Sequence, residues 1–293
     1  MSTQGSLQQD NVAFENRAVQ SQWRRAWHRL KRNKPAMFGL GVLILLLLAS
    51  VSANWIAPYD PYEQDLMMRF KPIGTEGHPL GTDSFGRDML SRILYGSRIS
   101  LVVGLSSVTL GLVFGVTLGL VAGYYRRLDN LIMRVIDVML AFPGVLLAIA
   151  IVAALGPGMW NVVIAIGIWS IPTFARIVRG QVLAIKDREY IIATQAIGCR
   201  DHRILFKHIL PNCLAPVIVY ATMRIASSIM SAATLSFLGL GAQPPMIAEG
   251  RSFLYNAPHI ATVPGLAIML VVFGFNLLGD GLRDALDPSV KDI

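Results

Sequence analysis

The chain has 293 residues, of which 54% are hydrophobic and only 15% are charged, and its net charge is +8. A soluble domain of this length carries about 25% charged residues, so the composition excludes an ordinary soluble protein. The positive charge does not indicate a nucleic-acid partner, because basic residues gather just before the first apolar run, as on the cytoplasmic flank of membrane helices. These residues are Arg24, Arg25, Arg29, Lys31, Arg32 and Lys34.

Six apolar stretches are each long enough to cross a bilayer, which takes about 20 residues. We therefore predict an all-α, polytopic membrane protein with six transmembrane helices. Glycines in the second stretch would let neighbouring helices approach closely; they are Gly104, Gly111, Gly115 and Gly119. The stretches cover approximately residues 36–57, 99–124, 131–155, 160–177, 213–237 and 260–278.

The polar segments between these stretches set the predicted orientation. The tail 1–35 is too long and too hydrophilic for a signal peptide, so we expect the first span to remain as an uncleaved anchor. Lysines and arginines in alternate loops place this tail and the C-terminal tail 283–293 in the cytoplasm. The segment 58–98, which has mixed charge, then lies outside, and residues 99–282 form the transmembrane core.

Local features flank the second and third spans. Residues 83–98 carry apolar side chains at helical spacing, which predicts an interfacial helix leading into the second span. Arg134 and Asp137 stand three apart on one face of the third span and can pair with each other. Four spans contain prolines, which indicate either helices that flex around a path or ordinary packing irregularity. These prolines are Pro143, Pro172, Pro216 and Pro264.

The most informative segment, residues 187–211, is polar and basic and separates two apolar spans. Asp187 and Asp201 can each cap a short helix, Gly198 between them suits the left-handed conformation that ends a helix, and Pro211 closes the second helix. The second helix carries Ile204, Leu205 and Ile209 on one side, with Arg203 and Lys207 on the others. Such a projection, with an apolar tip and a basic rim, favours docking of a cytoplasmic partner over a helix lying on lipid headgroups.

Arg224 is a cation in an unusual place. It lies about 12 Å past Pro216 along a helix, deep in the fifth span, where a charge is costly. One hypothesis is that it faces an aqueous translocation path and meets an anionic group such as a peptide carboxylate. The alternative is a buried arginine that backbone carbonyls or a carboxylate of a partner subunit satisfy.

Motifs of several enzyme classes are absent from the sequence. There is no Gly-x-x-x-x-Gly-Lys-Ser/Thr loop for ATP, no His-Glu-x-x-His zinc motif and no Gly-x-Ser-x-Gly nucleophile motif. Cys199 and Cys213 have no metal-binding spacing and are expected to be free thiols. The spans also lack a clear chain of carboxylates for proton relay. We therefore expect a non-catalytic chain that binds no metal.

Four stretches, with the segment 187–211 between them, carry a family resemblance. They are residues 80–88 (LGTDSFGRD), 95–101 (YGSRISL), 237–245 (FLGLGAQPP) and 279–288 (GDGLRDALDP). From about residue 23 to residue 288 the chain resembles the second permease subunit of dipeptide, oligopeptide, glutathione and nickel ABC importers. The resemblance implies the type I ABC-importer permease fold, with both termini cytoplasmic.

The segment 187–211 is similar to the loop through which these permeases receive the motion of a separate ATPase. The family motif reads Glu-Ala-Ala, three residues, Gly, nine residues, Ile, one residue, Leu-Pro. Its positions hold Ile192, Ala193, Thr194, Gly198, His208, Leu210 and Pro211, so the Glu and the Ile are replaced. The coupling residues that the resemblance implies are Glu189, Ala193, Thr194, Gly198, Arg203, Lys207, Leu210 and Pro211. A second departure is an outer loop that is several residues shorter after Pro245, where the family faces its binding protein.

The resemblance implies the transmembrane permease of an ATP-driven importer of di- or oligopeptides or of glutathione-like peptides. Its implied partners are a homologous permease in a heterodimer, two ABC ATPases that hold ATP and Mg, an extracytoplasmic solute-binding protein, and the lipid of a bacterial cytoplasmic membrane. The chain itself would bind no cofactor. A nickel importer of the same family is the alternative cargo. A stand-alone proton-coupled carrier, and a membrane enzyme or scaffold, are the alternatives from other classes.

Overall fold

The computed structural model describes residue 24, residues 26–241 and residues 246–286. Within these ranges the chain is mainly helical, without a named β-strand, and residues 57–88 form loops and turns. The elements, in chain order, are α2 (Lys34–Val51), α3 (Ala53–Ile56), the 3-10 turn η1 (Leu66–Met68), α4 (Met89–Tyr124), α5 (Arg126–Ala141), α6 (Gly144–Leu155), α7 (Met159–Lys186), α8 (Glu189–Ala196), α9 (Asp201–Arg203), the π-helical turn η2 (Ile204–Ile209), α10 (Leu210–Phe237), α11 (Met246–Arg251) and α12 (His259–Leu286).

Five of the six predicted spans are confirmed as long apolar helices, namely α2, α4, α7, α10 and α12. The third predicted span, 131–155, is not one straight helix, because α5 and α6 meet at a bend of 91°. Pro143 has no backbone N–H, and Phe142 before it is extended, at φ −87° and ψ 134°, which is where a following proline drives a residue. Counted as one broken span, this pair makes the sixth helix of the prediction.

Helix α4 begins at Met89, ten residues before the predicted start of its span. The Asp88 carboxylate caps it by accepting a hydrogen bond from the Ser91 backbone N–H at 2.7 Å. The helix predicted within residues 83–98 is confirmed from Met89 onward, and it leads without a break into the membrane span. With 36 residues, α4 is about 54 Å long and extends well beyond a hydrocarbon core of about 30 Å.

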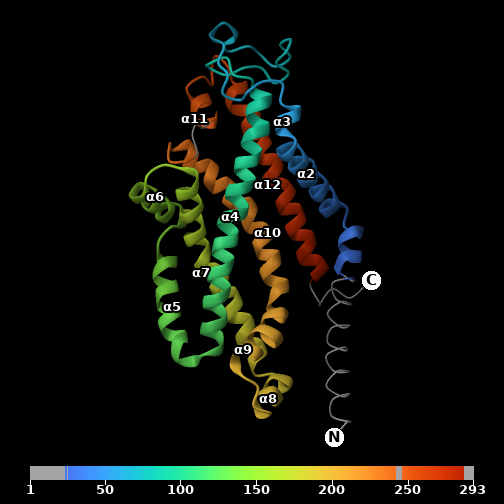
Figure 1. Ribbon diagram of the computed structural model, residues 1–293, viewed down its shortest axis with the longest axis vertical. Helices are drawn as coiled ribbons and strands as arrows, with labels where there is room; N and C mark the ends of the chain where they lie inside the picture. Colours follow the sequence, from blue (N-terminus) through green and yellow to red (C-terminus); the bar gives the residue numbers. More distant parts are fainter. Residues whose placement is uncertain (1–23, 25, 242–245, 287–293) are drawn as a thin grey trace.

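Helices α4 and α7 pack together along a row of glycines at the centre of the bundle (Figure 1). A Cβ atom on Gly115 would lie 2.4 Å from the Phe174 Cβ atom, and one on Gly119 would lie 2.6 Å from the Ala175 carbonyl oxygen. Any side chain at these positions would push the helices apart, so the predicted close approach is confirmed. Phe174 is fully buried in the core that this contact creates.

Helix α2 lies beside α12 (Figure 1). The side-chain oxygen of Asn33 caps α2 by accepting a hydrogen bond from the Ala36 backbone N–H at 3.1 Å. Ala36 also packs in a small apolar cluster with Ala285, near the end of α12. The start of the first span and the end of the last span therefore lie at the same end of the bundle, as they must when the number of spans is even. Most of the two predicted tails, residues 1–23 and 287–293, lies outside the described residues.

Ion pairs hold α5 against α7. Asp137 on α5 accepts a hydrogen bond from the Arg176 guanidinium on α7 at 2.7 Å, so the predicted pairing of Asp137 with Arg134 is wrong. Arg179, one turn further along α7, donates two hydrogen bonds to the Asp129 carboxylate, at 2.6 and 2.7 Å. The partner of Asp137 lies on a neighbouring helix, and residue spacing within one helix cannot reveal such a partner.

Candidate functional site

The segment 187–211 forms a small projection at one end of the bundle, opposite the loops that precede α4 (Figure 1). Gly198 has a φ of +78°, which confirms the predicted left-handed conformation. No atom lies within 4 Å of the place where its Cβ atom would stand, so the backbone conformation, and not crowding, calls for glycine. Glu189 occupies the first turn of α8, as predicted.

The predicted helix caps of this projection are wrong. Asp187 ends α7, and Arg188 stands at the N-cap of α8 without a side-chain capping bond. Arg200 likewise stands at the N-cap of α9, and Asp201 is the first residue inside that helix. Each aspartate lies one position away from the cap, which is the usual scale of error for helix ends.

The base of the projection is packed into the protein core. Ile191, Ile204 and Ile209 have no exposed surface, and they join the core cluster that includes Val182 of α7 and Cys213 of α10. The predicted apolar side of the second helix therefore faces inward and does not form the tip. Because closely packed interiors do not deform freely, any motion of the projection would also shift the ends of α7 and α10 that pack against it.

The tip of the projection exposes other apolar side chains. Ile192, Ile197 and Phe206 are 52%, 77% and 64% exposed. The same projection exposes predicted coupling residues that are polar or small, namely Glu189, Ala193, Arg203, Lys207 and Pro211, while Thr194 and Leu210 are half-buried. An exposed apolar group rimmed by charge at the end of a bundle is typical of a surface that another protein covers. We name Ile192, Ile197 and Phe206 the apolar tip.

Polar contacts tie the projection to the end of α4. The Tyr124 hydroxyl donates a hydrogen bond to the Asp201 carboxylate at 2.9 Å, and the Lys186 ammonium donates to the Gly123 carbonyl oxygen at 3.0 Å. Partial burial, and then the nearby Asp201 carboxylate, raise the pKa of the Tyr125 phenol above its ordinary value. Both tyrosines follow directly on the glycines of α4, so these contacts link the projection to the helix at the centre of the bundle.

Arg224 lies half-buried on α10. Its Nε donates a hydrogen bond to the Ser170 Oγ at 3.1 Å, its Nη1 lies 3.5 Å from the Ser227 Oγ, and its guanidinium carbon is 4.4 Å from the centre of the Trp169 ring. Among the residues that the structure describes, none pairs a carboxylate with Arg224. Two hydroxyls and a ring, and not backbone carbonyls, are the contacts of the Arg224 guanidinium.

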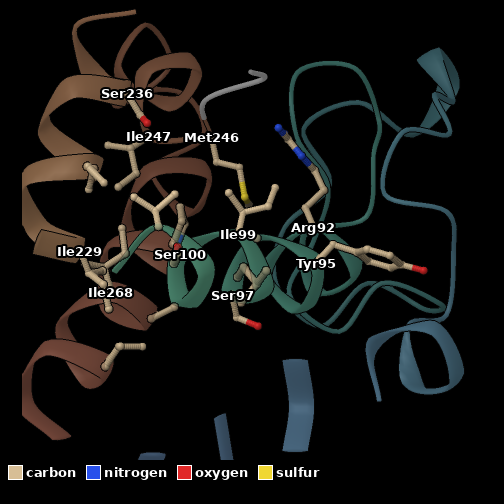
Figure 2. A pocket seen from close by; sticks show the side chains of 18 of the residues that line it. Arg92, Tyr95, Ser97, Ile99, Ser100, Ile229, Ser236, Met246, Ile247 and Ile268 are labelled. Carbon is tan, nitrogen blue, oxygen red and sulfur yellow. The ribbon is translucent and has the colours of Figure 1, made fainter. Parts of the chain in front are cut away.

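A cavity of about 230 Å³ lies among α4, α10, α11 and α12. Most of its lining is apolar, and Figure 2 shows Met246 and Ile247, at the start of α11, in the same lining as Ile99 of α4. Arg92 and Tyr95 of α4 add polar groups. No cluster of three or more metal-ligating side chains occurs in the described part of the chain, and both Cys199 and Cys213 are free thiols.

Two family models match the chain. Residues 111–292 match the binding-protein-dependent transport system inner membrane component, and residues 21–72 match the N-terminal TM domain of oligopeptide transport permease C. The chain belongs to the family of binding-protein-dependent transport system inner membrane components. The resemblance drawn from the sequence motifs is thereby confirmed, and the multi-pass helical architecture is that of a transport permease.

Curated relatives match the permease over nearly its whole length. The glutathione transport system permease protein GsiD of Pectobacterium atrosepticum is 50% identical over 286 residues, which cover 95% of each chain. The dipeptide transport system permease protein DppC of Alkalihalophilus pseudofirmus is 49% identical over 278 residues, which cover 92% of this chain and 91% of the relative.

Solved structures confirm the fold. A chain of the methionine ABC transporter MetNI, in an inward-facing conformation, superimposes with a TM-score of 0.55 at 19% identity. The match covers 64% of the permease and 93% of the other chain. At this identity the likeness concerns the fold alone, and it confirms the predicted fold of an ABC-transporter permease.

The end of the bundle opposite the projection, which the sequence predicts to be the outer end, contains an ion-pair cluster that the sequence did not reveal. Asp83, fully buried, accepts hydrogen bonds from the Arg87 Nε at 2.6 Å and from Arg92. Glu249 of α11 also accepts from both arginines, at 2.6 and 3.1 Å. We name these four residues the outer ion cluster. Asp83 and Arg87 belong to the stretch 80–88, but nothing in the sequence signals a partner 162 residues away. Residues 242–245 of the shortened outer loop lie outside the described part.

Proposed function

We propose that the permease is the membrane-spanning subunit of an ATP-driven importer of peptides, including glutathione-like peptides. The observation that carries this proposal is the likeness to named glutathione and dipeptide permeases, at 50% and 49% identity over more than nine-tenths of the chain. A likeness of that extent includes the projection, the spans and the outer segment together. It therefore favours the same kind of cargo over nickel.

The energy for import comes, in this proposal, from two partner ATPases that hold ATP and Mg. The permease has no ATP-binding loop of its own and acts without catalysing hydrolysis. The ATPases bind the apolar tip in this proposal. The exposure of its three apolar side chains, together with charged residues on the same projection, supports this role. The buried base then carries the movement into α7 and α10, and the Tyr124–Asp201 hydrogen bond carries it into α4.

The same proposal fixes the orientation and the other partners. The apolar tip and both chain ends lie in the cytoplasm of a bacterium, and the outer segment 58–88 faces an extracytoplasmic solute-binding protein. A homologous second permease completes a heterodimer, and the path for the peptide runs between the two. The chain binds no cofactor in this scheme.

The first test is to purify the tagged permease from its native host in a mild detergent and to identify the proteins that accompany it. A second permease and two ATPases with phosphate-binding loops are expected. Recovery of the permease alone, under conditions that keep another ABC complex of the host intact, would contradict the proposal.

The second test is uptake in cells that lack the gene and in cells that carry it on a plasmid. Radiolabelled glutathione and a radiolabelled dipeptide are the probes, and ⁶³Ni²⁺ is the third. Restored peptide uptake that stops on ATP depletion but survives a protonophore supports the importer. Uptake that stops with the protonophore alone points to a proton-coupled carrier, and restored uptake of nickel alone would replace the peptide cargo.

A further inference from the structure

A polar face runs along the outer half of α10, inside the apolar span. Arg224, Ser227, Ser231 and Thr234 follow one another at intervals of three, four and three residues, so they lie on one face of the helix. Ser227 and Thr234 are exposed, and Arg224 and Ser231 are half-buried. We name these four residues the polar face. In the bilayer core a charged, hydroxyl-rich surface points to a protein interface or a water-filled cavity, and away from lipid.

The hydroxyls of this face keep capacity for a ligand. Ser231 donates to the Ser227 carbonyl oxygen at 2.8 Å, and Thr234 donates to the Met230 carbonyl oxygen at 3.0 Å. Each hydroxyl therefore donates its hydrogen bond to a carbonyl oxygen of its own helix, and its lone pairs stay able to accept hydrogen bonds from a ligand or water. The face thus offers acceptors along most of its length and one fixed cation, Arg224, at its inner end.

The surroundings of Arg224 hold its charge without neutralising it. Its hydrogen-bond partners, Ser170 and Ser227, are neutral, and the Trp169 ring lies against the guanidinium. A ring and hydroxyls orient an arginine, but within the described residues no carboxylate offsets the charge. Since an uncompensated cation is costly at this depth, the geometry calls for an anion that comes from outside the chain.

The break in the third span lies against the same place. A Cβ atom on Gly144, the first residue of α6, would stand 1.7 Å from the Trp169 indole. The N-terminal end of α6, which has no side-chain cap, is therefore next to the ring that covers Arg224. The start of a helix carries partial positive charge, and in transporters such interrupted helices turn this end toward anionic substrate groups. The bend and the arginine thus favour the same sign of ligand.

We propose that Arg224, held by Trp169, Ser170 and Ser227, is a subsite for a carboxylate of the transported peptide, in an aqueous path that the polar face lines. The guanidinium fork matches a carboxylate geometrically, and the pairing is charge-assisted. This inference rests on the proposed function for the identity of the cargo. The rival ligand, a carboxylate of the second permease, becomes an outcome of the test.

The test measures the reactivity of cysteines placed on the polar face in the purified complex. Ser227→Cys, Ser231→Cys and Thr234→Cys are each treated with two methanethiosulfonate reagents of similar size, one anionic (sulfonatoethyl) and one cationic (trimethylammonium-ethyl). The parent chain, with Cys199 and Cys213, gives the blank. Leu45→Cys, on an exposed apolar position of α2, is the control and is expected not to react, because a thiol in hydrocarbon stays protonated.

The subsite predicts a preference that depends on Arg224. Ser227→Cys should react faster with the anionic reagent, and adding Arg224→Gln should lower the anionic-to-cationic rate ratio by about fivefold. Arg224→Lys, which keeps the charge, should preserve the ratio. If none of the three cysteines reacts with either reagent, the polar face lies in an interface closed to water, and the proposed aqueous path is rejected. An unchanged ratio in Arg224→Gln would mean that a partner's carboxylate already neutralises the arginine, and would overturn the subsite.

Uptake separates this inference from the proposed function. Arg224→Gln should lower dipeptide uptake by about tenfold without loss of partner subunits from the purified complex, and Arg224→Lys should restore part of it. Loss of the second permease from the Arg224→Gln complex would support the rival carboxylate and reject the subsite. A complex that imports no peptide, yet shows the Arg224-dependent ratio, would reject peptide import while keeping an anion-binding path.

Discussion

The two ends of the permease are built in opposite ways. The projection 187–211, which the proposed orientation makes the inner end, exposes apolar side chains and meets α4 through a few polar contacts. The outer end buries charged side chains, and the outer ion cluster joins the segment before α4 to α11. An exposed apolar tip is typical of a surface that another protein covers, whereas the charges of the buried cluster pair with one another. Under the proposed function, the projection is the end that moves and the ion cluster keeps the opposite end in shape.

The strongest challenge to this contrast is to remove the acid at the centre of the outer ion cluster. Asp83→Ala would leave the buried Arg87 and Arg92 short of a counter-charge, and breaking a buried pair in this way costs about 3–5 kcal/mol. We expect a large fall in thermal stability of the purified permease, measured by its unfolding temperature in detergent. Glu76→Ala, an exposed acid of the same outer segment, is the matched control. Equal stability of the two variants would show that the cluster does not hold the outer end.

The inner end should respond in the opposite manner, with lost partners and unchanged folding. Ile197→Asp places a charge in the apolar tip, and loss of a central interface contact costs about 2 kcal/mol of binding. We expect the variant to insert normally but to recover far less ATPase on purification. Asn130→Asp adds the same charge at an exposed position of α5 and should recover the ATPase fully. Normal ATPase recovery with Ile197→Asp would remove the tip from the docking surface.

A smaller effect is expected from the glycine between α8 and α9. Gly198→Val forces a β-branched residue into the left-handed region, at a cost of about 1–2 kcal/mol, and should lower peptide uptake by about tenfold without loss of the protein from the membrane. Gly198→Asn is the control, because asparagine tolerates this conformation and the space around the site is open. If both variants transport equally, the conformation of Gly198 has no part in coupling.

Hydropathy predicted the membrane spans well, because a helix is the only way in which a single segment can satisfy its backbone in lipid. It predicted the bend of the third span poorly. Pro172, Pro216 and Pro264 lie inside continuous helices, while Pro143 marks a turn of 91°. A proline permits a break but does not require one, and in the broken span α6 packs against α7.

The candidate site was predicted in part. The left-handed conformation of Gly198 could be predicted because it is local, and the position of Arg224 inside a span because a cation in an apolar run is visible in the sequence. The roles of both residues stay predictions. Ile204 and Ile209 share one side as predicted, but its inward direction was missed because the side chains that cover it, such as Val182 of α7, lie outside the segment. The outer ion cluster was missed because Glu249 meets Arg87 and Arg92 only through the tertiary fold. Local conformation can be read from neighbouring residues, whereas partners across the fold cannot.

The smallest predicted effect tests the link between the inner end and the centre of the bundle. Tyr124→Phe removes the hydroxyl that donates to Asp201, a bond worth about 1 kcal/mol, and should lower peptide uptake two- to threefold with normal ATPase recovery. Tyr255→Phe, at a fully exposed outer tyrosine, should change nothing. The Tyr124 hydroxyl also accepts a longer hydrogen bond from Gln195, at 3.4 Å, so Tyr124→Phe combined with Asp201→Ala should lower uptake by less than the sum of the two single losses. Additive losses would mean that each residue acts on coupling by a separate route, and that α4 receives its motion elsewhere.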